Sequence, residues 1–138
     1  MIYVFDASFV GALIIPDEKN PLVSKMYSKI ENEDEKHAPN LIWYEISNIF
    51  NNLIRRKRYT FDEVNQLFPY LSAIRLTCDN ETGTGYSAKL FRLCNDFGIS
   101  SYDAAYLELA KRKKAVLCTV DAELLGAAKK YGVPVISE

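Results

Sequence analysis

The 138-residue sequence contains one histidine, His37, and three cysteines, Cys78, Cys94 and Cys118, none of them in a CxxC spacing. A single histidine excludes a His-rich zinc site. An odd number of isolated cysteines favours reduced thiols over a disulfide or zinc framework. We therefore place the chain in a reducing compartment. His37 stands close to a proline in a polar stretch, and we interpret it as a surface or loop residue.

Long apolar runs are also absent. A membrane-spanning helix needs about 18 or more apolar residues in succession, and the N-terminus has no basic segment of the kind that precedes a secretory signal. These absences predict a cytoplasmic protein with no membrane partner. The length is close to the commonest size of one domain, so we expect residues 1–138 to form a single domain.

Charge of one sign is not in excess, because the formal net charge is −1. That balance excludes a strongly basic nucleic-acid coat protein but not a nuclease. Two basic clusters occupy residues 55–58 and 111–114. Cations suit the negative ends of helix dipoles, so both clusters are interpreted first as solvated helix ends, with a nucleic-acid track as the second interpretation. Walker A, GxGxxG and GxSxG patterns are missing.

The chain does contain strand and helix signals in alternation. Short apolar runs predict strands, and apolar residues at helical spacing predict helices. Alternation of this kind is typical of an α/β protein whose central parallel sheet is covered by helices on both faces. The expected strands are 2–5, 75–79, 115–120 and 133–136, with a short extended piece at 37–39, and the expected helices are 8–15, 22–32, 41–56, 61–74, 86–96, 102–112 and 122–131.

Particular residues mark the expected helix ends. Asn40 is a candidate N-cap for helix 41–56, and Thr60 with Glu63 forms a capping box for helix 61–74. Pro69 should kink or divide that helix. The two glycines at positions 83 and 85 predict a turn, and Gly98 suits a helix C-terminus.

Four carboxylates lie beside apolar segments, where charge is costly unless it is compensated. Asp6 ends the apolar run 2–5, and Asp121 follows the apolar run 115–118. Asp103 opens an apolar helical segment, and Glu45 lies inside another. Ligands of parallel sheets bind beyond the carboxyl ends of the strands, where Asp6 and Asp121 are expected. A divalent cation would compensate such a group of acids.

Each acid also has an ordinary structural role open to it. Asp6 and Asp121 are good helix caps, and Asp103 lies in a first helical turn, where negative charge is favoured. Glu45 is harder to assign to such a role, because it shares the apolar side of its helix instead of the polar side. The structural alternative for Glu45 is a position at the edge of the apolar side, where it would form an ion pair with an arginine. The apolar positions concerned are Ile42, Ile46, Ile49 and Leu53.

Two small hydroxyls accompany the acids. Ser8 lies two residues after Asp6, and Thr119 lies two residues before Asp121. Residues two apart in an extended stretch point the same way, so each hydroxyl can orient the neighbouring carboxylate or a water. The alternative is ordinary turn chemistry, which serine and threonine favour.

The order of these motifs resembles the PIN domain family, and most closely its small VapC-type toxins. The resemblance rests on Phe-Asp-Ala-Ser at 5–8, on residues 101–110 and on Cys-Thr-Val-Asp at 118–121 with Gly-Val-Pro-Val downstream. Residues 51–96 match only in helical character. The resemblance implies a three-layer α/β/α sandwich with the acids at one end. It also implies that the protein forms a homodimer and that it is a ribonuclease which a co-expressed antitoxin neutralises.

The resemblance further implies that Asp6, Glu45, Asp103 and Asp121 form a catalytic and metal-binding quartet, with Ser8 and Thr119 in support. Together with the residues themselves, it predicts a Mg²⁺- or Mn²⁺-dependent endoribonuclease with an RNA substrate, a toxin with an antitoxin partner. One alternative is a catalytically silent PIN-like module that binds RNA or protein. A second alternative is a receiver-like or phosphatase domain that uses Asp6 as the phosphoryl acceptor. Such a domain would need an acidic pair beside Asp6, and the sequence has none there.

Overall fold

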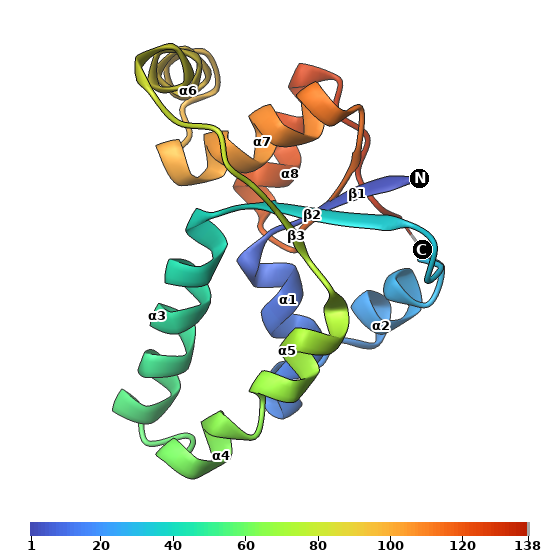
Figure 1. The fold of residues 1–138 in the computed structure, drawn as a ribbon, viewed down its shortest axis with the longest axis vertical. Helices are drawn as coiled ribbons and strands as arrows, with labels where there is room; N and C mark the ends of the chain where they lie inside the picture. The colour runs from blue at the N-terminus through green and yellow to red at the C-terminus, as the bar shows by residue number, and fades with distance from the viewer. Residues whose placement is uncertain (138) are drawn as a thin grey trace.

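The structure, a computed structural model, describes residues 1–137. Four short strands form one parallel sheet in the order β3-β2-β1-β4 (Figure 1). In register, Tyr3 lies between Lys36 of β2 and Val116 of β4. The strands are β1 (Ile2–Phe5), β2 (Glu35–Pro39), β3 (Thr77–Asp79) and β4 (Val116–Cys118).

Helices cover both faces of the sheet, as Figure 1 shows, and this arrangement confirms the predicted α/β/α sandwich with a parallel sheet. One layer consists of α6 (Thr84–Phe97), α7 (Ser101–Lys113) and α8 (Ala122–Tyr131). On the other side lie α1 (Ala7–Ile14), η1 (Pro16–Glu18), α2 (Pro21–Tyr27), α3 (Leu41–Arg55), α4 (Phe61–Asn65) and α5 (Phe68–Ile74).

The hydrophobic core explains why the strand ends are fixed in place. Val4 and Phe5 of β1 are fully buried, and the ring of Phe5 packs on that of Phe9 in α1 with centroids 5.0 Å apart. Helix α7 is buried without interruption from Ala104 to Ala110, because α6 covers the side that turns away from the sheet. The chain that leaves β1 and the part of α7 that directly follows Asp103 are therefore both anchored in the core.

The strongest sequence signals for helix ends are confirmed. Thr60 and Glu63 form the complete capping box of α4. Pro69 divides the expected helix 61–74 into α4 and α5 and stands in the first turn of α5, where its missing N–H is harmless. Gly98 adopts the left-handed conformation after α6.

Several sequence predictions were wrong in detail. Helix α2 ends at Tyr27, well before the expected residue 32, and the polar residues Glu35 and Lys36 join β2. Asn40 does not cap α3, because its side-chain amide donates to Asn80 Oδ1 at 2.8 Å instead. Gly85 lies inside α6 and not in a turn. The expected strand 133–136 is reduced to a single bridge between Leu117 and Val135.

The interpretation of His37 as a surface or loop residue was also wrong. His37 lies in β2, between β1 and β3, and is only 7% exposed. Its Nε2 has no hydrogen-bond partner, and the nearest carboxylate oxygen, Glu35 Oε1, is 3.6 Å away. The three cysteines are free thiols, as expected. Among residues 1–137, no helix is long and apolar enough to cross a bilayer.

Candidate active site

All four acids line one cavity of about 310 Å³. It opens where β1 and β4 end, at the carboxyl edge of the sheet. Asp6 follows β1, Glu45 comes from the second turn of α3, Asp103 from the first turn of α7, and Asp121 directly precedes α8. Ala7, Ser8, Asn48, Ile49 and Tyr106 complete the lining. Acids that lie up to 115 positions apart in the sequence are thus brought together as the pattern predicted.

Asp6 and Asp121 are helix caps as well as cavity residues. Oδ1 of Asp6 accepts the backbone N–H of Phe9 at 2.9 Å, and Oδ1 of Asp121 accepts that of Leu124 at 3.0 Å. The ordinary structural role therefore holds for both, but it does not exclude a functional one. A cap fixes the orientation of the carboxylate relative to the sheet edge, which is what a binding site requires.

The two predicted hydroxyls surround Asp6. Ser8 Oγ donates to Asp6 Oδ1 at 2.8 Å, and Thr119 Oγ1 donates to Asp6 Oδ2. The backbone N–H groups of Val120 and Asp121 in turn donate to Ser8 Oγ (3.2 Å) and Thr119 Oγ1 (3.0 Å). These bonds tie the end of β4 to the start of α1 and hold Asp6 and Asp121 at a fixed separation.

Glu45 is oriented by a tyrosine and not by an arginine, so the alternative of an arginine pair is wrong. The hydroxyl of Tyr106 donates to Glu45 Oε1 at 2.5 Å. The buried side of α3 consists of Ile42, Ile46, Phe50 and Leu53, whereas the expected Ile49 is half-buried and lines the cavity. Glu45 thus lies at the border of the apolar side and turns toward the other acids.

Asp103 differs from the other three acids in having no partner. Its backbone N–H donates to Ser100 Oγ, the cap of α7, at 3.1 Å. Its carboxylate accepts no hydrogen bond and forms no ion pair within residues 1–137, although it is only partly exposed. A partly buried carboxylate without a donor is the group most in need of an external cation.

The electrostatics of the cavity favour a positive ligand. Burial raises the pKa of Asp6 to about 6, and the charge of Asp121 adds to the effect, although the three hydrogen bonds oppose it. Burial also raises the pKa of Glu45, with smaller contributions from Asp6 and Asp103. The pKa of Asp103 is raised by burial and then by Asp121 and Glu123. Neighbouring acids thus add to burial in making Asp6, Glu45 and Asp103 harder to ionise, and a cation would oppose this.

The donor set suits a small hard cation, since carboxylate oxygens are the ligands that Mg²⁺ and Mn²⁺ prefer. Within residues 1–137, however, no three His, Cys, Asp or Glu side chains are arranged closely enough to bind one ion together. Mg²⁺ commonly takes one or two carboxylates and keeps several waters. Asp6 and Asp121, whose orientations are fixed, are the residues that would hold such an ion, with Asp103 and Glu45 within the same cavity.

Sequence reasoning missed three residues of this site. Asn48 and Tyr106 line the cavity, and the charge of Glu123 acts on Asp103. The first two carried a usable signal, because Asn48 lies three residues after Glu45 and Tyr106 lies three after Asp103, and residues three apart share one side of a helix. No comparable signal marks Glu123 before the relative placement of α7 and α8 is known.

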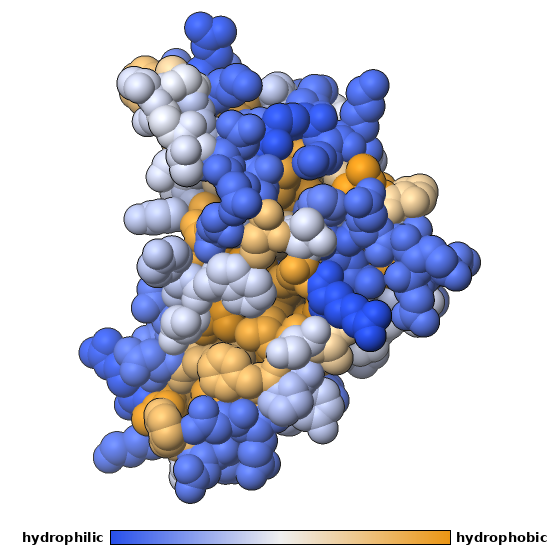
Figure 2. Space-filling model, viewed as in Figure 1, coloured by the Kyte–Doolittle hydropathy of each residue, from blue (hydrophilic) through white to orange (hydrophobic). Residues whose placement is uncertain are grey.

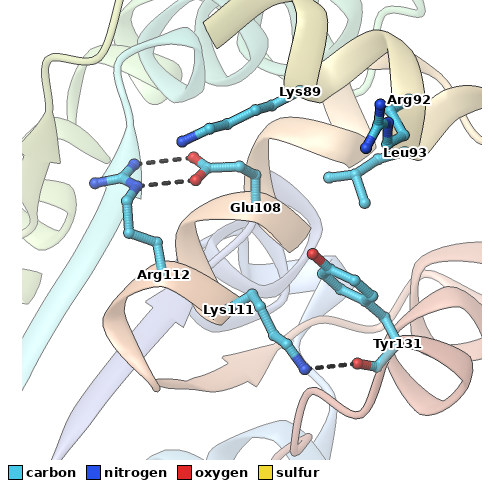
Figure 3. A pocket seen from close by; sticks show the side chains of 7 residues that line it. All are labelled: Lys89, Arg92, Leu93, Glu108, Lys111, Arg112 and Tyr131. Carbon is cyan, nitrogen blue, oxygen red and sulfur yellow. Dashed lines mark hydrogen bonds and ion pairs between the residues drawn. The ribbon is translucent and has the colours of Figure 1, made fainter. Parts of the chain in front are cut away.

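A second hollow, of about 360 Å³, lies at the far end of α7 and is lined by two residues of the second basic cluster, Lys111 and Arg112 (Figure 3). Arg112 forms ion pairs with Glu108 at 2.9 Å and with Asp79 at 2.7 Å. Lys111 Nζ donates to the carbonyl oxygen of Tyr131 at 2.9 Å and stands 4.7 Å from the centre of its ring. These two cations are used inside the fold, which supports their interpretation as helix-end residues.

Comparisons with known proteins agree with this architecture. The chain is 29% identical to ribonuclease VapC3 of Pyrobaculum aerophilum over 128 residues, which is 90% of this chain and 92% of that protein. It superposes with a TM-score of 0.67 on VapC20 of Mycobacterium tuberculosis, a toxin that cleaves the sarcin–ricin loop (14% identity, all of both chains). The TM-score is 0.64 with VapBC2 of Rickettsia felis bound to a promoter DNA fragment (17% identity, 100% and 98% of the chains).

The PIN domain model matches residues 3–136, which include all four acids of the cavity and every strand of the sheet except the first residue of β1. Nearly the whole chain is therefore accounted for by one family, and this protein belongs to the PIN domain family.

Proposed function

We propose that this protein is an endoribonuclease that hydrolyses RNA phosphodiester bonds with the help of Mg²⁺ or Mn²⁺, and that it is the toxin of a toxin–antitoxin pair. The observation that carries the proposal is the convergence of Asp6, Glu45, Asp103 and Asp121 on one cavity at the carboxyl edge of the sheet. The relative named ribonuclease VapC3 supports the same activity. When bound, the ion supplies a Lewis acid that offsets charge on the phosphoryl oxygens.

The residues of the chain have distinct parts in this proposal. Asp6 and Asp121, held by their caps and by the hydroxyls of Ser8 and Thr119, form the fixed side of the site. Glu45, whose pKa is raised by burial, is suited to accept a proton from the attacking water. Asp103 completes the negative charge of the cavity. Acids from four separate elements can thus act on one phosphate.

The products follow from the absence of a second histidine. With only His37, which is buried in β2, the chain has no pair of histidines to promote attack by the 2′-hydroxyl. The attacking group is therefore a water molecule. Its oxygen forms a new bond to phosphorus as its proton passes to Glu45, and the bond from phosphorus to the 3′-oxygen breaks. The 3′-oxygen takes up a proton from solvent, so the products carry a 5′-phosphate and a 3′-hydroxyl.

The direct test is cleavage of mixed-sequence RNA oligonucleotides by the purified protein in Mg²⁺ or Mn²⁺, with EDTA as the control. We expect cleavage that depends on metal and leaves 5′-phosphate ends, which a 5′-phosphate-dependent exonuclease detects. Cleavage that is equal in EDTA would contradict the metal requirement. Metal binding without cleavage of any RNA would instead favour a silent binding module.

We further propose an antitoxin partner and a homodimer, on the basis of the VapBC2 neighbour and of the apolar surface. Figure 2 shows hydrophobic residues gathered between α3 and α5, below a mainly hydrophilic region around α7. Large exposed hydrophobic residues are unusual in such number without a partner. Those on α3–α5 are Trp43, Tyr44, Phe61, Phe68 and Tyr70. Co-expression with the product of an adjacent open reading frame, followed by size-exclusion chromatography with light scattering, measures both assemblies.

Replacement of Tyr106 by phenylalanine tests the role of Glu45. The Tyr106 hydroxyl lowers the pKa of Glu45 by donating to it, so Tyr106→Phe should raise that pKa further. We expect the acid side of the pH–rate profile to move to higher pH, because loss of this hydrogen bond disfavours the charged form of Glu45. Tyr102→Phe is the matched control, because Tyr102 is on the same helix and 61% exposed. An unmoved acid limb would remove Glu45 from the proton transfer.

A further inference from the structure

A smaller hollow of about 190 Å³ adjoins the acidic cavity between α1 and α3. Both are lined by Ala7, Ser8 and Ile49, so the two hollows lie directly beside each other, and the smaller one extends away from the acids. We call this smaller hollow the side groove. Its other lining residues are Gly11, Glu18, Asn52, Leu53, Arg56 and Arg58.

One side of α3 runs along both hollows. Glu45 and Asn48 line the acidic cavity, and Asn52 and Arg56 line the side groove. These residues are spaced by three, four and four positions, which places them in one row along α3, with Arg56 at the C-terminal cap of the helix. At 1.5 Å per residue, Arg56 lies about 16 Å further along the axis than Glu45. The row begins with a catalytic candidate, continues with two amides and ends with a cation.

The two arginines of the side groove differ in their partners. Arg58 is held by Asp17 at 2.6 Å and by Glu18 at 3.1 Å, so its charge is offset by two carboxylates and is not free for an outside anion. Arg56 forms no ion pair and donates no side-chain hydrogen bond within residues 1–137. It is therefore the lining cation whose guanidinium is available to an anion from outside, and a guanidinium suits phosphate geometry.

We propose that the side groove holds the RNA strand next to the bond that is cut, with Arg56 bound to a backbone phosphate and Asn52 hydrogen-bonded to a base or ribose. Arg56 is then a positioning residue, and it gives the first basic cluster, residues 55–58, one member that contacts nucleic acid. The assignment rests on the proposed ribonuclease function, because it takes the acidic cavity as the place where the scissile phosphate lies.

The chain offers unusually close controls. Asn51 and Arg55 are the direct neighbours of Asn52 and Arg56, have the same side chains and are likewise exposed, but do not line the side groove. Fluorescence anisotropy with a labelled single-stranded RNA of mixed sequence measures affinity on an Asp6→Asn background, where the RNA stays intact. We compare Arg56→Ala with Arg55→Ala, and Asn52→Ala with Asn51→Ala, over a series of KCl concentrations.

Arg56→Ala should weaken RNA binding about tenfold, as expected for a charge-assisted hydrogen bond. It should also reduce the slope of log Kd against log salt by about 0.7, the value for one phosphate contact on a single strand. Arg56→Lys should keep the slope. Asn52→Ala should weaken binding without a change of slope. Arg55→Ala and Asn51→Ala should bind like the parent.

Equal effects of Arg55→Ala and Arg56→Ala would overturn the assignment, and so would an Asp6→Asn parent that does not bind the RNA. Circular dichroism melts of each variant exclude unfolding as the cause of a loss. Failure of the proposed ribonuclease function can be told apart from failure of the side-groove assignment, because that function is measured by metal-dependent cleavage with the wild-type protein. If the wild type cleaves RNA but Arg55→Ala and Arg56→Ala weaken binding equally, the side-groove assignment alone is refuted. If only Arg56→Ala weakens binding but the wild type cleaves no RNA, the nuclease function alone is refuted.

Discussion

Asp6→Asn is expected to reduce RNA cleavage at least about a thousandfold, and at the same time to raise the melting temperature of the metal-free protein. The loss of activity follows from removing the charge of the most buried acid in the cavity, which would hold the cation with Asp121. Removing one electrostatic element of an active site typically costs two to three orders of magnitude, and loss of the ion costs more.

The gain in stability follows from the pKa of Asp6. Burial raises it from 3.8 to about 6. The folded state therefore binds the proton more tightly than the unfolded state, and stability falls as the pH rises between these two values. Full ionisation costs about 3 kcal/mol by this difference. The asparagine gives up part of the hydrogen bonding with Ser8 and Thr119, so we expect a net gain of about 1–2 kcal/mol, or about 5 °C.

The pH dependence separates this cause from a general stabilising effect. Near pH 4, where Asp6 is protonated, Asp6→Asn should melt at or below the temperature of the wild type, because only its weaker hydrogen bonding counts. The order should reverse as the pH rises to about 6, and the difference should stay constant above it. Mn²⁺ should raise the melting temperature of the wild type and have much less effect on the variant. Asp96→Asn, at an exposed position of α6, is the control. An Asp6→Asn protein that unfolds, or that still cuts RNA, would contradict the assignment.

The convergence of the acids could be predicted because each is next to a strong local signal. Asp6 directly follows the buried strand β1. Asp121 follows β4 and caps a helix that Gly132 ends. Both β1 and β4 belong to one parallel sheet. In such a sheet the carboxyl ends meet at one edge whatever the loops do. Glu45 could be recognised because a carboxylate among apolar helix positions is costly to the fold unless a partner or a ligand compensates its charge.

The errors arose where tertiary contacts outweigh local preference. Asn40 is a suitable N-cap by residue type, but the segment after β3 places Asn80 within reach of its amide. His37 looked exposed because its neighbours are polar, whereas β2 lies inside the sheet and buries it. The side groove was equally invisible, because Asn51 and Asn52, or Arg55 and Arg56, are indistinguishable until α3 is packed beside α1.

Arg112→Met should destabilise the fold by about 2–3 kcal/mol and lower the melting temperature by about 10 °C. Arg112 joins Glu108 of α7 to Asp79 of β3, and these two carboxylates are only 8% and 12% exposed (Figure 3 shows the Glu108 pair). Loss of the arginine leaves both carboxylates without an ion-pair partner and with little exposure to water. The effect is below that of a fully buried pair, because the Arg112 side chain is itself 28% exposed.

A second substitution tests the cause. Glu108→Gln on the Arg112→Met background removes one of the two unpaired charges, so it should recover about half of the lost stability, whereas Glu108→Gln alone should be destabilising. Lys129→Met removes an exposed cation from the last turn of α8 and should change the melting temperature by little. Urea unfolding at pH 7 measures the free energy of unfolding of these four variants and of the wild type. If Arg112→Met and Lys129→Met are equally stable, the ion pairs that join α7 to β3 contribute no more than a surface charge, and the position of α7, with Asp103 at its other end, is fixed by apolar packing alone.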